Sequence, residues 1–488
     1  MADATIDPAS IANHYQGTNR LTVGIVLAVI TFWLFAQTTL NVAPAMRDDL
    51  GIGNSVSNIA VSIAALFSGI FIVVAGGLAD HLGRVKLTNS GLALSVLGSL
   101  LIATSPKGTA VFLIAGRIIQ GLSAACIMPA TLALMKAYYD GKERQRALSF
   151  WSIGSWGGSG LCALFGGLLA STIGWRWIFW MSIAVSVVSY FLIRGSPESK
   201  VQQVEAKPFD WYGLSAFVIV MLALNVIIGQ GSVLGWTSPA MLGLLVTFVA
   251  VSGAFFRIET KSENPFVNFK LFANKTYSGA TLSNFLLNGA SGTLLVTLSL
   301  VQQGAGLSSL QSGLMTTGYL VAILATIRVG EKLLQRWGPR RPMLLGCAIT
   351  GAGILLTTFT FLLAKEYVIA AFVGFTLFGI GLGFYATPST DAAISNVPDD
   401  KVGSASGIYK MASSLGAAIG VAISAAIFTD LSGMQGLSPM ADIAMGRTDN
   451  LNIRFAAAIA LLFNVAMVAV AMFAISQTVP KTQPGKTT

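Results

Sequence analysis

The sequence predicts an all-α integral membrane protein with fourteen transmembrane helices, arranged as two six-helix bundles plus two inserted helices. Three observations predict this fold class. Hydrophobic residues make up 54% of the 488 residues and charged residues only 10%, less than half of the ~25% that is typical of soluble domains. The apolar residues form continuous runs, each about as long as the ~20 residues that cross a bilayer. Parts of the first half also recur in the second.

Fourteen apolar segments can be delimited along the chain. The first six cover roughly 21–46, 56–79, 87–105, 109–138, 148–171 and 176–195. Two more follow a polar stretch, at roughly 211–230 and 239–257, and the last six cover 277–301, 309–330, 342–363, 367–395, 403–428 and 453–476. Because the runs are continuous rather than alternating, they exclude a porin-like β-barrel. An even number of spans places both termini on one side.

The 30 lysines and arginines orient the chain. With the N-terminus inside, 23 of them, Lys410 included, fall on the inner side, and six, Arg454 included, fall on the outer side. One, Arg117, lies within a span. The positive-inside rule therefore predicts a cytoplasmic N-terminal tail over 1–20 and a cytoplasmic C-terminal tail over 477–488. Because the net charge of +10 is spread over many loops and forms no single basic face, it does not indicate nucleic-acid binding.

Internal repetition divides the chain. Residues 78–86 are similar to residues 333–341, and three further positions repeat at a similar spacing, namely Pro129, Asp140 and Gly157 with Pro388, Asp399 and Gly416. The repeats predict two related six-helix bundles, over 21–195 and 277–476, with the inserted pair over 211–257 between them. Two parallel repeats with a binding site at their interface are typical of secondary transporters.

The stretch 76–84 joins the second and third helices on the cytoplasmic side and has the residues of a gate. Its glycines allow a tight turn. Asp80 can accept hydrogen bonds from the free amides at a neighbouring helix N-terminus, and Arg84 can pair with Asp140 or Glu143 at the end of the fourth helix. Such contacts would hold the inner side closed, and the second copy of the pattern favours this interpretation over an ordinary polar loop. The expected gate comprises Gly76, Asp80, Gly83, Arg84, Asp140 and Glu143.

Small residues recur at every fourth position of the fifth and thirteenth helices. They are Gly154, Gly158, Cys162, Gly166 and Ala170 in the fifth helix, and Ala412, Gly416, Gly420 and Ser424 in the thirteenth. Residues four apart share one helix face, so both helices allow close backbone contact. We expect the two stripes to line the interface at which the bundles move, although static close packing would need the same residues.

Two charged residues fall inside predicted spans. Arg117 lies about two turns below the outer face, where a charge costs at least ~2.5 kcal/mol. Gln37 and Asn41 lie at a similar depth and offer it acceptors, for either a structural hydrogen bond or a role in proton or substrate coupling. Asp391 follows Pro388 by three residues. It is either a proton carrier inside the twelfth helix or, if that helix ends at the proline, a solvated cap.

The sequence has few candidate catalytic or metal-ligating residues. The only histidines are His14 in the tail and His81 in a loop, so the spans contain no cluster of catalytic bases. Cys126, Cys162 and Cys347 lie in separate apolar runs without metal-ligand spacing. We therefore expect neither an enzyme nor a metal or cofactor site.

Several stretches resemble the major facilitator superfamily, and in particular its fourteen-helix drug:proton antiporters. The loop 76–86 is similar to the signature loop of the superfamily, and 117–121 to its helix-four motif. Other similar stretches are 30–37, 154–167, 174–179, 210–213, 264–266 and 385–391. The resemblance covers nearly the whole chain. It implies the major facilitator fold and export of varied drugs, quinolone-like compounds among them, with the proton gradient as the energy source and no cofactor.

The chain departs from this family at two places. Gln37 stands where the family has an acid on the first helix, and Cys162-Ala163 stand where it usually has Gly-Pro. Glutamine cannot titrate, so Asp391 becomes the first candidate to carry or relay the proton, with Arg117 tuning the cavity. Glu331, which we expect in a cytoplasmic loop, is the reserve candidate.

The sequence therefore predicts a proton-coupled multidrug exporter in the cytoplasmic membrane of a bacterium, a monomer that works by alternating access. Its partners are amphipathic drugs, protons and the lipid bilayer. Few cavity carboxylates make dications poor substrates and favour neutral, zwitterionic or anionic aromatic compounds. The alternative is a metabolite exporter or importer of the same fold, working as a uniporter or symporter. A channel fits the spans but not the repeated gating loops.

Overall fold

The computed structural model describes residues 15–200, 210–235, 237–262, 265, 267–307, 309–362, 364–433 and 449–481. In these ranges every regular element is a helix. The expected tails lie mostly outside the described residues, since 1–14 and 482–488 are not among them. Of the stretch 264–266, only residue 265 is described.

The chain divides into two compact units. Unit 1 comprises Met1–Asn225, Val246–Ala273 and Ile394–Met411. Unit 2 comprises Val226–Leu245, Asn274–Ala393 and Ala412–Thr488. Boundaries between the units fall within four helices, and one of them, near the C-terminus, has its first turns in unit 1 and the rest in unit 2.

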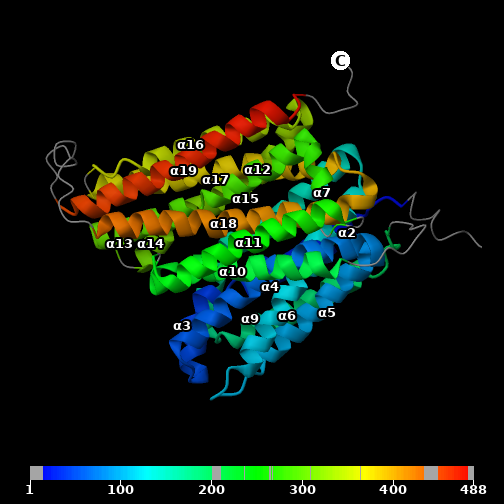
Figure 1. Cartoon of the computed structure of the whole chain (residues 1–488), viewed down its shortest axis with the longest axis horizontal. Coiled ribbons are helices and arrows are strands. Elements are labelled where there is room, and N and C mark those ends of the chain that lie inside the picture. The colour runs from blue at the N-terminus through cyan, green and yellow to red at the C-terminus, as the bar shows by residue number, and fades with distance from the viewer. Residues whose placement is uncertain are drawn as a thin grey trace, which may run out of the picture. The chain divides into compact units, whose positions relative to one another are not determined.

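Unit 1 is built mainly from the helices drawn in blue and cyan in Figure 1. They are α2 (Asn19–Ile30), η1 (Thr31–Ala36), α3 (Thr39–Leu50), α4 (Asn54–Leu82), α5 (Arg84–Ala103), α6 (Val111–Tyr138), α7 (Gly141–Ser152), η2 (Ile153–Gly157), α8 (Gly158–Thr172) and α9 (Arg176–Ile193). α5 packs against both α6 and α9, while α4 packs on α6 and α2 on α9. Two elements are π-helical, η1 in the first predicted span and η2 in the fifth.

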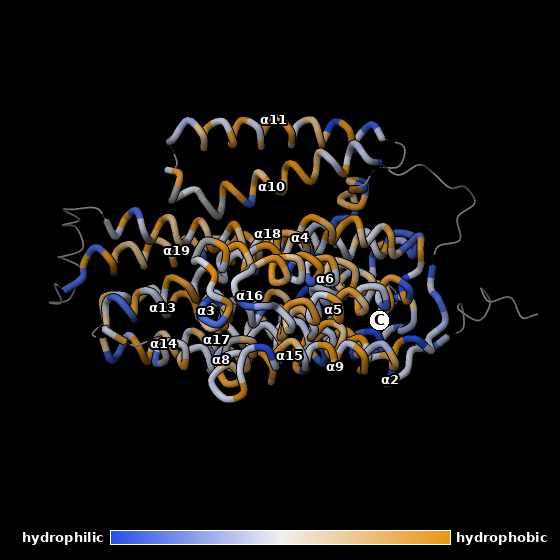
Figure 2. Tube along the Cα trace, turned by 90° about the horizontal axis from the view of Figure 1, so that it is seen from below, coloured by the Kyte–Doolittle hydropathy of each residue, from blue (hydrophilic) through white to orange (hydrophobic). Residues whose placement is uncertain are grey.

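Two inserted helices follow, α10 (Trp211–Leu234) and α11 (Pro239–Lys261), and then the short η3 (Phe269–Ala273). Figure 2 shows mostly apolar residues along both long helices. Only 6% of the most apolar stretch of α11 is buried, as expected for a helix that faces lipid. The rings of Phe217 and Phe255, 5.6 Å apart, join the two helices within unit 1.

The remaining helices begin with α12 (Lys275–Gly289), α13 (Gly292–Ala305), α14 (Ser309–Met315), α15 (Thr317–Trp337), α16 (Arg340–Thr357) and α17 (Ala364–Ser395). They end with η4 (Asp399–Lys401), α18 (Val402–Ser432) and α19 (Leu451–Thr478). In unit 2, α19 packs against α12, α13 and α16. η4 and the first turns of α18 belong to unit 1.

All fourteen predicted apolar segments coincide with helices. Within the described residues, 11 helices are long and apolar enough to cross a membrane, or 12 if the bent pair Gly141–Cys162 and Leu164–Thr172 forms one span. The described apolar part of α10, Trp211–Ile227, is shorter, and α16, which begins with an arginine pair, is not among the 11. For these two segments, crossing the membrane stays a prediction.

Candidate gate and buried polar residues

Asp80 makes the contact expected of it. At the end of α4, its Oδ1 accepts a hydrogen bond from the amide of Gly403 at 2.9 Å, and its Oδ2 accepts one from the amide of Ser404 at 3.0 Å. Both donors are free amides in the first turn of α18, where a helix favours negative charge. A Cβ on Gly403 would collide with the carbonyl oxygen of Gly76, so α4 and the start of α18 are in direct backbone contact.

Arg84 does not pair with Asp140 or Glu143, and that expectation was wrong. Its Nη2 lies 2.9 Å from Asp80 Oδ1 and donates to the carbonyl oxygen of Asp399 at 2.7 Å. Asp140 and Glu143 are exposed at the start of α7. Gly83, with φ at +115°, turns the chain between α4 and α5 and thereby brings Arg84 back onto Asp80, which lies only one turn earlier in the sequence.

Lys136 adds a third contact that sequence reasoning missed. It stands at the end of α6, and its Nζ lies 2.9 Å from Asp399 Oδ1 and donates to the carbonyl oxygen of Val397. Its position at the end of a span near the gate loop was the only available signal. Asp80, Arg84 and Lys136 thus connect three helices to the segment 397–404, all within unit 1; we call these three residues the gate cluster.

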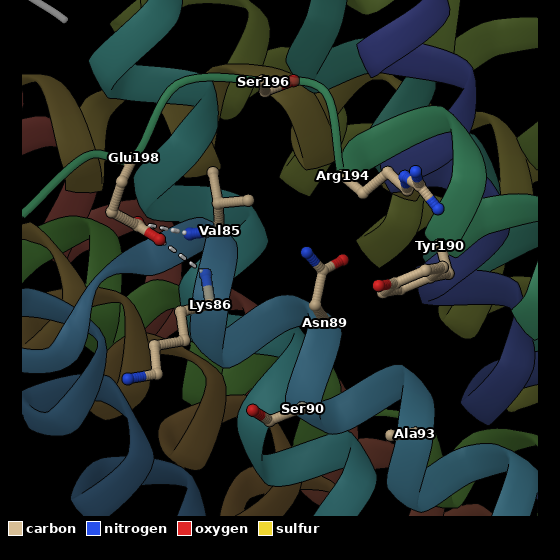
Figure 3. A pocket seen from close by; sticks show the side chains of 9 residues that line it. All are labelled: Val85, Lys86, Asn89, Ser90, Ala93, Tyr190, Arg194, Ser196 and Glu198. Atoms are coloured by element: carbon tan, nitrogen blue, oxygen red, sulfur yellow. Dashed lines mark hydrogen bonds between the residues drawn. The ribbon is translucent and has the colours of Figure 1, made fainter. Parts of the chain in front are cut away.

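The segment 194–200, which follows α9 and which we call the strap, packs against the loop between α4 and α5. Figure 3 shows the Glu198 carboxylate accepting hydrogen bonds from the amides of Val85 and Lys86, both at 2.9 Å. These amides open α5, where a carboxylate is favoured by the helix dipole. The strap borders a pocket of about 520 Å³, which Lys86, Asn89 and Arg194 also line. The sequence analysis did not identify Glu198.

Arg117 is buried, with 1% of its surface exposed, but Gln37 and Asn41 are not its partners. Its guanidinium donates to the carbonyl oxygens of Ala36 at 2.8 Å, Ala60 at 2.8 Å and Val61 at 3.1 Å. It also donates to Gln120 Oε1 at 2.8 Å. Bonded on all sides to the backbone of η1 and α4, Arg117 has the contacts of a structural residue.

Gln37 and Asn41 face a different helix. Gln37 is half-buried at the end of η1, where its backbone N–H donates to the carbonyl oxygen of Phe32 at 3.0 Å. Asn41 is exposed, and its Nδ2 lies 3.7 Å from the sulfur of Cys162 on α8. Asn41 therefore faces α8, whereas Arg117 reaches the first span through the backbone carbonyl of Ala36.

Asp391 lies inside a helix. α17 continues through Pro388 to Ser395, so the alternative that the helix ends at the proline is wrong. Asp391 is buried, with 3% of its surface exposed. Two residues before it, Ser389 Oγ donates to Tyr385 Oη at 2.8 Å, and the same tyrosine hydroxyl is 2.7 Å from Ser283 Oγ of α12. A chain of buried hydroxyl groups thus runs from Ser283 through Tyr385 to Ser389, on the same helix as Asp391.

Three further charged residues, which the sequence analysis assigned to the inner or outer side of the membrane, are buried. Glu331 is not in a loop but inside α15, where it pairs with Arg328 and accepts from Gln335 at 3.0 Å. Lys410 lies two turns into α18 with only 6% exposed. Arg454, in the first turn of α19, is also buried, and its Nε donates to the carbonyl oxygen of Thr360 at 2.5 Å. α15 therefore continues past the apolar segment that was predicted to end near residue 330.

The small-residue stripes make close contacts inside each unit, and their expected place at a moving interface stays a prediction. In unit 1, the faces of Gly158 and Gly166 are filled by Trp33 and Thr38 of the first predicted span. In unit 2, Cβ atoms on Gly416 and Gly420 would collide with the backbone of Phe285 and Gly289. Static close packing explains these residues, and the two repeats use them in the same way. Gly154, too, contacts α2, through Val26.

Asp49, at the end of α3, contacts the start of α9. It pairs with Arg176 and accepts from Trp175 Nε1 at 3.1 Å. Burial opposes its ionisation, but the hydrogen bond and the charge of Arg176 outweigh that effect and hold the pKa of the Asp49 carboxyl below its usual value.

Paired helical repeats, a loop that caps a distant helix N-terminus, and charges buried inside helices are the features of a secondary transporter. A family model described as "Major Facilitator Superfamily" matches residues 22–264 and 280–488, and the chain belongs to that superfamily. It is a multi-pass membrane transporter and not an enzyme. The expected fold class and family are thereby confirmed.

Among named proteins, the quinolone resistance protein NorB of Staphylococcus aureus is similar over nearly the full length. The protein from strain COL is 52% identical over 467 residues, which cover 96% of this chain and 97% of the relative. The protein from strain MRSA252 is 54% identical over 431 residues, which cover 88% and 93%.

Solved structures with the same fold are more distant. The proton:xylose symporter XylE has a TM-score of 0.63 at 14% identity, covering 95% of this chain and 96% of that one. The human organic anion transporter MFSD10 has a TM-score of 0.59 at 14% identity, with 96% and 100% covered. At such identities the likeness concerns the fold alone.

Proposed function

We propose that this chain exports amphipathic drugs, quinolones among them, across the cytoplasmic membrane of a bacterium in exchange for protons. The observation that carries the proposal is its 52% identity over 96% of its length to a protein named for quinolone resistance. The match extends over nearly the whole chain, so the similarity is not confined to one bundle. The transporter acts as a monomer by alternating access, with both termini in the cytoplasm.

The organisation we propose follows the repeats. Residues 21–195 and 277–476 form the two bundles, and 211–257 form the inserted pair. The excess of lysine and arginine on the side of the gate loop supports a cytoplasmic gate. For the cavity to open inward, the gate cluster must release the segment 397–404, because Asp80, Arg84 and Lys136 each bond to it.

Asp391 is our candidate proton carrier. It is a carboxyl group buried inside a membrane-spanning helix, where an ionisable residue marks a functional site. Gln37 cannot carry charge, and the hydrogen bonds of Arg117 assign it to holding the first span against α4. Glu331 is the second candidate, and it is held in an ion pair with Arg328.

The test is transport in inverted membrane vesicles with an imposed pH gradient. A pH-sensing dye would report proton movement while uptake of norfloxacin, a quinolone, is followed by its fluorescence. We expect norfloxacin to dissipate the gradient in vesicles with the wild-type protein and not in vesicles without it. Asp391→Asn should abolish this drug-dependent proton flux.

Two outcomes would contradict the proposal. Full gradient-driven export by Asp391→Asn would remove the proton assignment, and Glu331→Gln would then be the next variant. Drug movement by the wild-type protein without any gradient would instead favour a uniporter of the same fold.

A further inference from the structure

Lys410 is a cation buried against two tryptophan rings. Its Nζ lies 4.8 Å from the ring centre of Trp151 and 5.6 Å from that of Trp33. All three residues belong to unit 1. Ammonium groups within about 6 Å of an indole face are attracted by its electrons, and this attraction offsets part of the cost of burying the charge.

Both tryptophans stand at π-helical turns. Trp33 lies within η1, and Trp151 comes two residues before η2; these two elements contact each other. Trp151 is fixed by a hydrogen bond from its Nε1 to Thr131 Oγ1 at 3.0 Å. A single π-helical turn inside an α-helix frequently marks a functional site, and here two such turns place aromatic rings on one lysine.

Several polar atoms near Lys410 are buried without a hydrogen-bond partner among the described residues. They are the indole Nε1 of Trp33, the hydroxyl of Ser152, which follows Trp151, and the hydroxyl of Ser406, one turn before Lys410 on the same face of α18. Buried polar groups are nearly always bonded. Open donors next to a buried cation suit an acceptor with negative charge.

Arg117 is not available for such a role. Its four hydrogen bonds to Ala36, Ala60, Val61 and Gln120 use its donors. Arg84 is held in the gate cluster by Asp80 and Asp399. Among the buried basic residues of unit 1 that the structure describes, Lys410 is the one that lies within 6 Å of two indole rings.

We propose that Lys410, the indole N–H of Trp33 and the hydroxyl of Ser406 bind the carboxylate of a planar aromatic substrate, while the faces of Trp33 and Trp151 hold its rings. The proposal rests on the function proposed above and deepens it, because it names the substrate group that one site recognises. The ammonium and the N–H donate to the carboxylate oxygens, and offset stacking on indole supplies the apolar contact.

The experiment compares one substrate with and without its charge. Norfloxacin carries a carboxylate, and its ethyl ester keeps the ring system but loses that charge. We would measure the apparent KM of both compounds in inverted vesicles for the wild type, Lys410→Gln and Lys410→Arg. Lys410→Gln should raise the KM of norfloxacin about tenfold or more, the loss expected for a hydrogen bond between charged groups, and leave the ester nearly unchanged.

Two variants serve as controls. Lys410→Arg keeps the cation and should restore most of the affinity for norfloxacin. Trp33→Phe keeps a ring but removes the open N–H, so it should weaken norfloxacin by about threefold to tenfold and the ester less. Export of the ester by each variant also demonstrates that the variant is folded.

Equal losses for both compounds, or no loss for either, would overturn the carboxylate assignment. Failure of the proposed function is a separate result, in which the wild type moves neither compound. In that case equilibrium binding of norfloxacin and its ester to the purified full-length protein tests the same site, and equal affinities in the wild type and Lys410→Gln would refute it.

Discussion

Asp80→Asn offers the sharpest test of the gate. The carboxylate accepts from two amides at the start of α18 and pairs with Arg84. An asparagine keeps one acceptor oxygen, but it turns an NH₂ group toward the second amide and loses the ion pair. Arg84 retains its bonds to Asp399 and Ser199, which limits the loss. One charge-assisted bond and part of an ion pair amount to about 2–3 kcal/mol.

A change of this size shifts the equilibrium between closed and open gate by about 30-fold to 150-fold. The assay is labelling of Ser404→Cys by a membrane-impermeant maleimide in inverted vesicles. The Ser404 side chain lies against Gly77, where a Cβ would come 3.6 Å from its hydroxyl, so it is half-buried while the gate is closed. Adding Asp80→Asn should therefore raise the rate of labelling at position 404 by at least about tenfold.

Asp140→Asn is the matched control. It is the aspartate that sequence reasoning placed in the gate, but it is exposed and makes no contact with Arg84 in the structure. It should leave the labelling rate unchanged, and Asp80→Asn without the introduced cysteine measures the background from the native thiols. Equal labelling rates with and without the Asp80→Asn substitution would refute the assignment of Asp80 to the gate.

Three further predictions concern packing and stability. Arg117→Lys should lower the temperature of thermal unfolding, because one ammonium cannot reach all four acceptors. The transport that remains should still be coupled to protons, and uncoupled drug movement would contradict the structural role. Gly416→Leu should destabilise the protein by about 1–3 kcal/mol or more, since the new side chain meets the backbone of Phe285. Gly167→Leu, where nothing lies within 4 Å, should be tolerated, and equal yields of the two would contradict the close packing. Asp49 has a depressed pKa, so its stabilising effect is present above its unfolded pKa and is lost as the pH falls through the folded value, below about 4. Arg176→Gln should therefore lessen the acid sensitivity of thermal unfolding, and an unchanged pH profile would count against the pair.

Much of the gate could be predicted because it depends on local chemistry. Asp80 follows an apolar helix and precedes a glycine turn, and a buried carboxylate at that place needs donors, which a helix N-terminus supplies. The ion-pair partner of Arg84 was harder to predict. Its long side chain could reach several carboxylates, and only the path of the backbone through Gly83 places it at Asp80 rather than Asp140.

Buried charges were the least predictable part of the site. Glu331 looks like a loop residue in the sequence because it follows an apolar run, and Lys410 looks like a charge at the inner side of the membrane. α15 nevertheless continues past that run to Trp337, and Lys410 lies within α18 with only 6% of its surface exposed. The partners of the small-residue stripes were also ambiguous, because small residues permit close contact but do not specify which helix makes it.

By itself, the sequence determined the class of protein and the positions of its helices. A run of about 20 apolar residues has one stable form in lipid, in which all backbone groups bond within the helix. Only the tertiary structure decided which charged side chains are buried and what they touch. Those contacts join residues as far apart as Trp33 and Lys410, and a pattern along the chain carries no information about such distances in space.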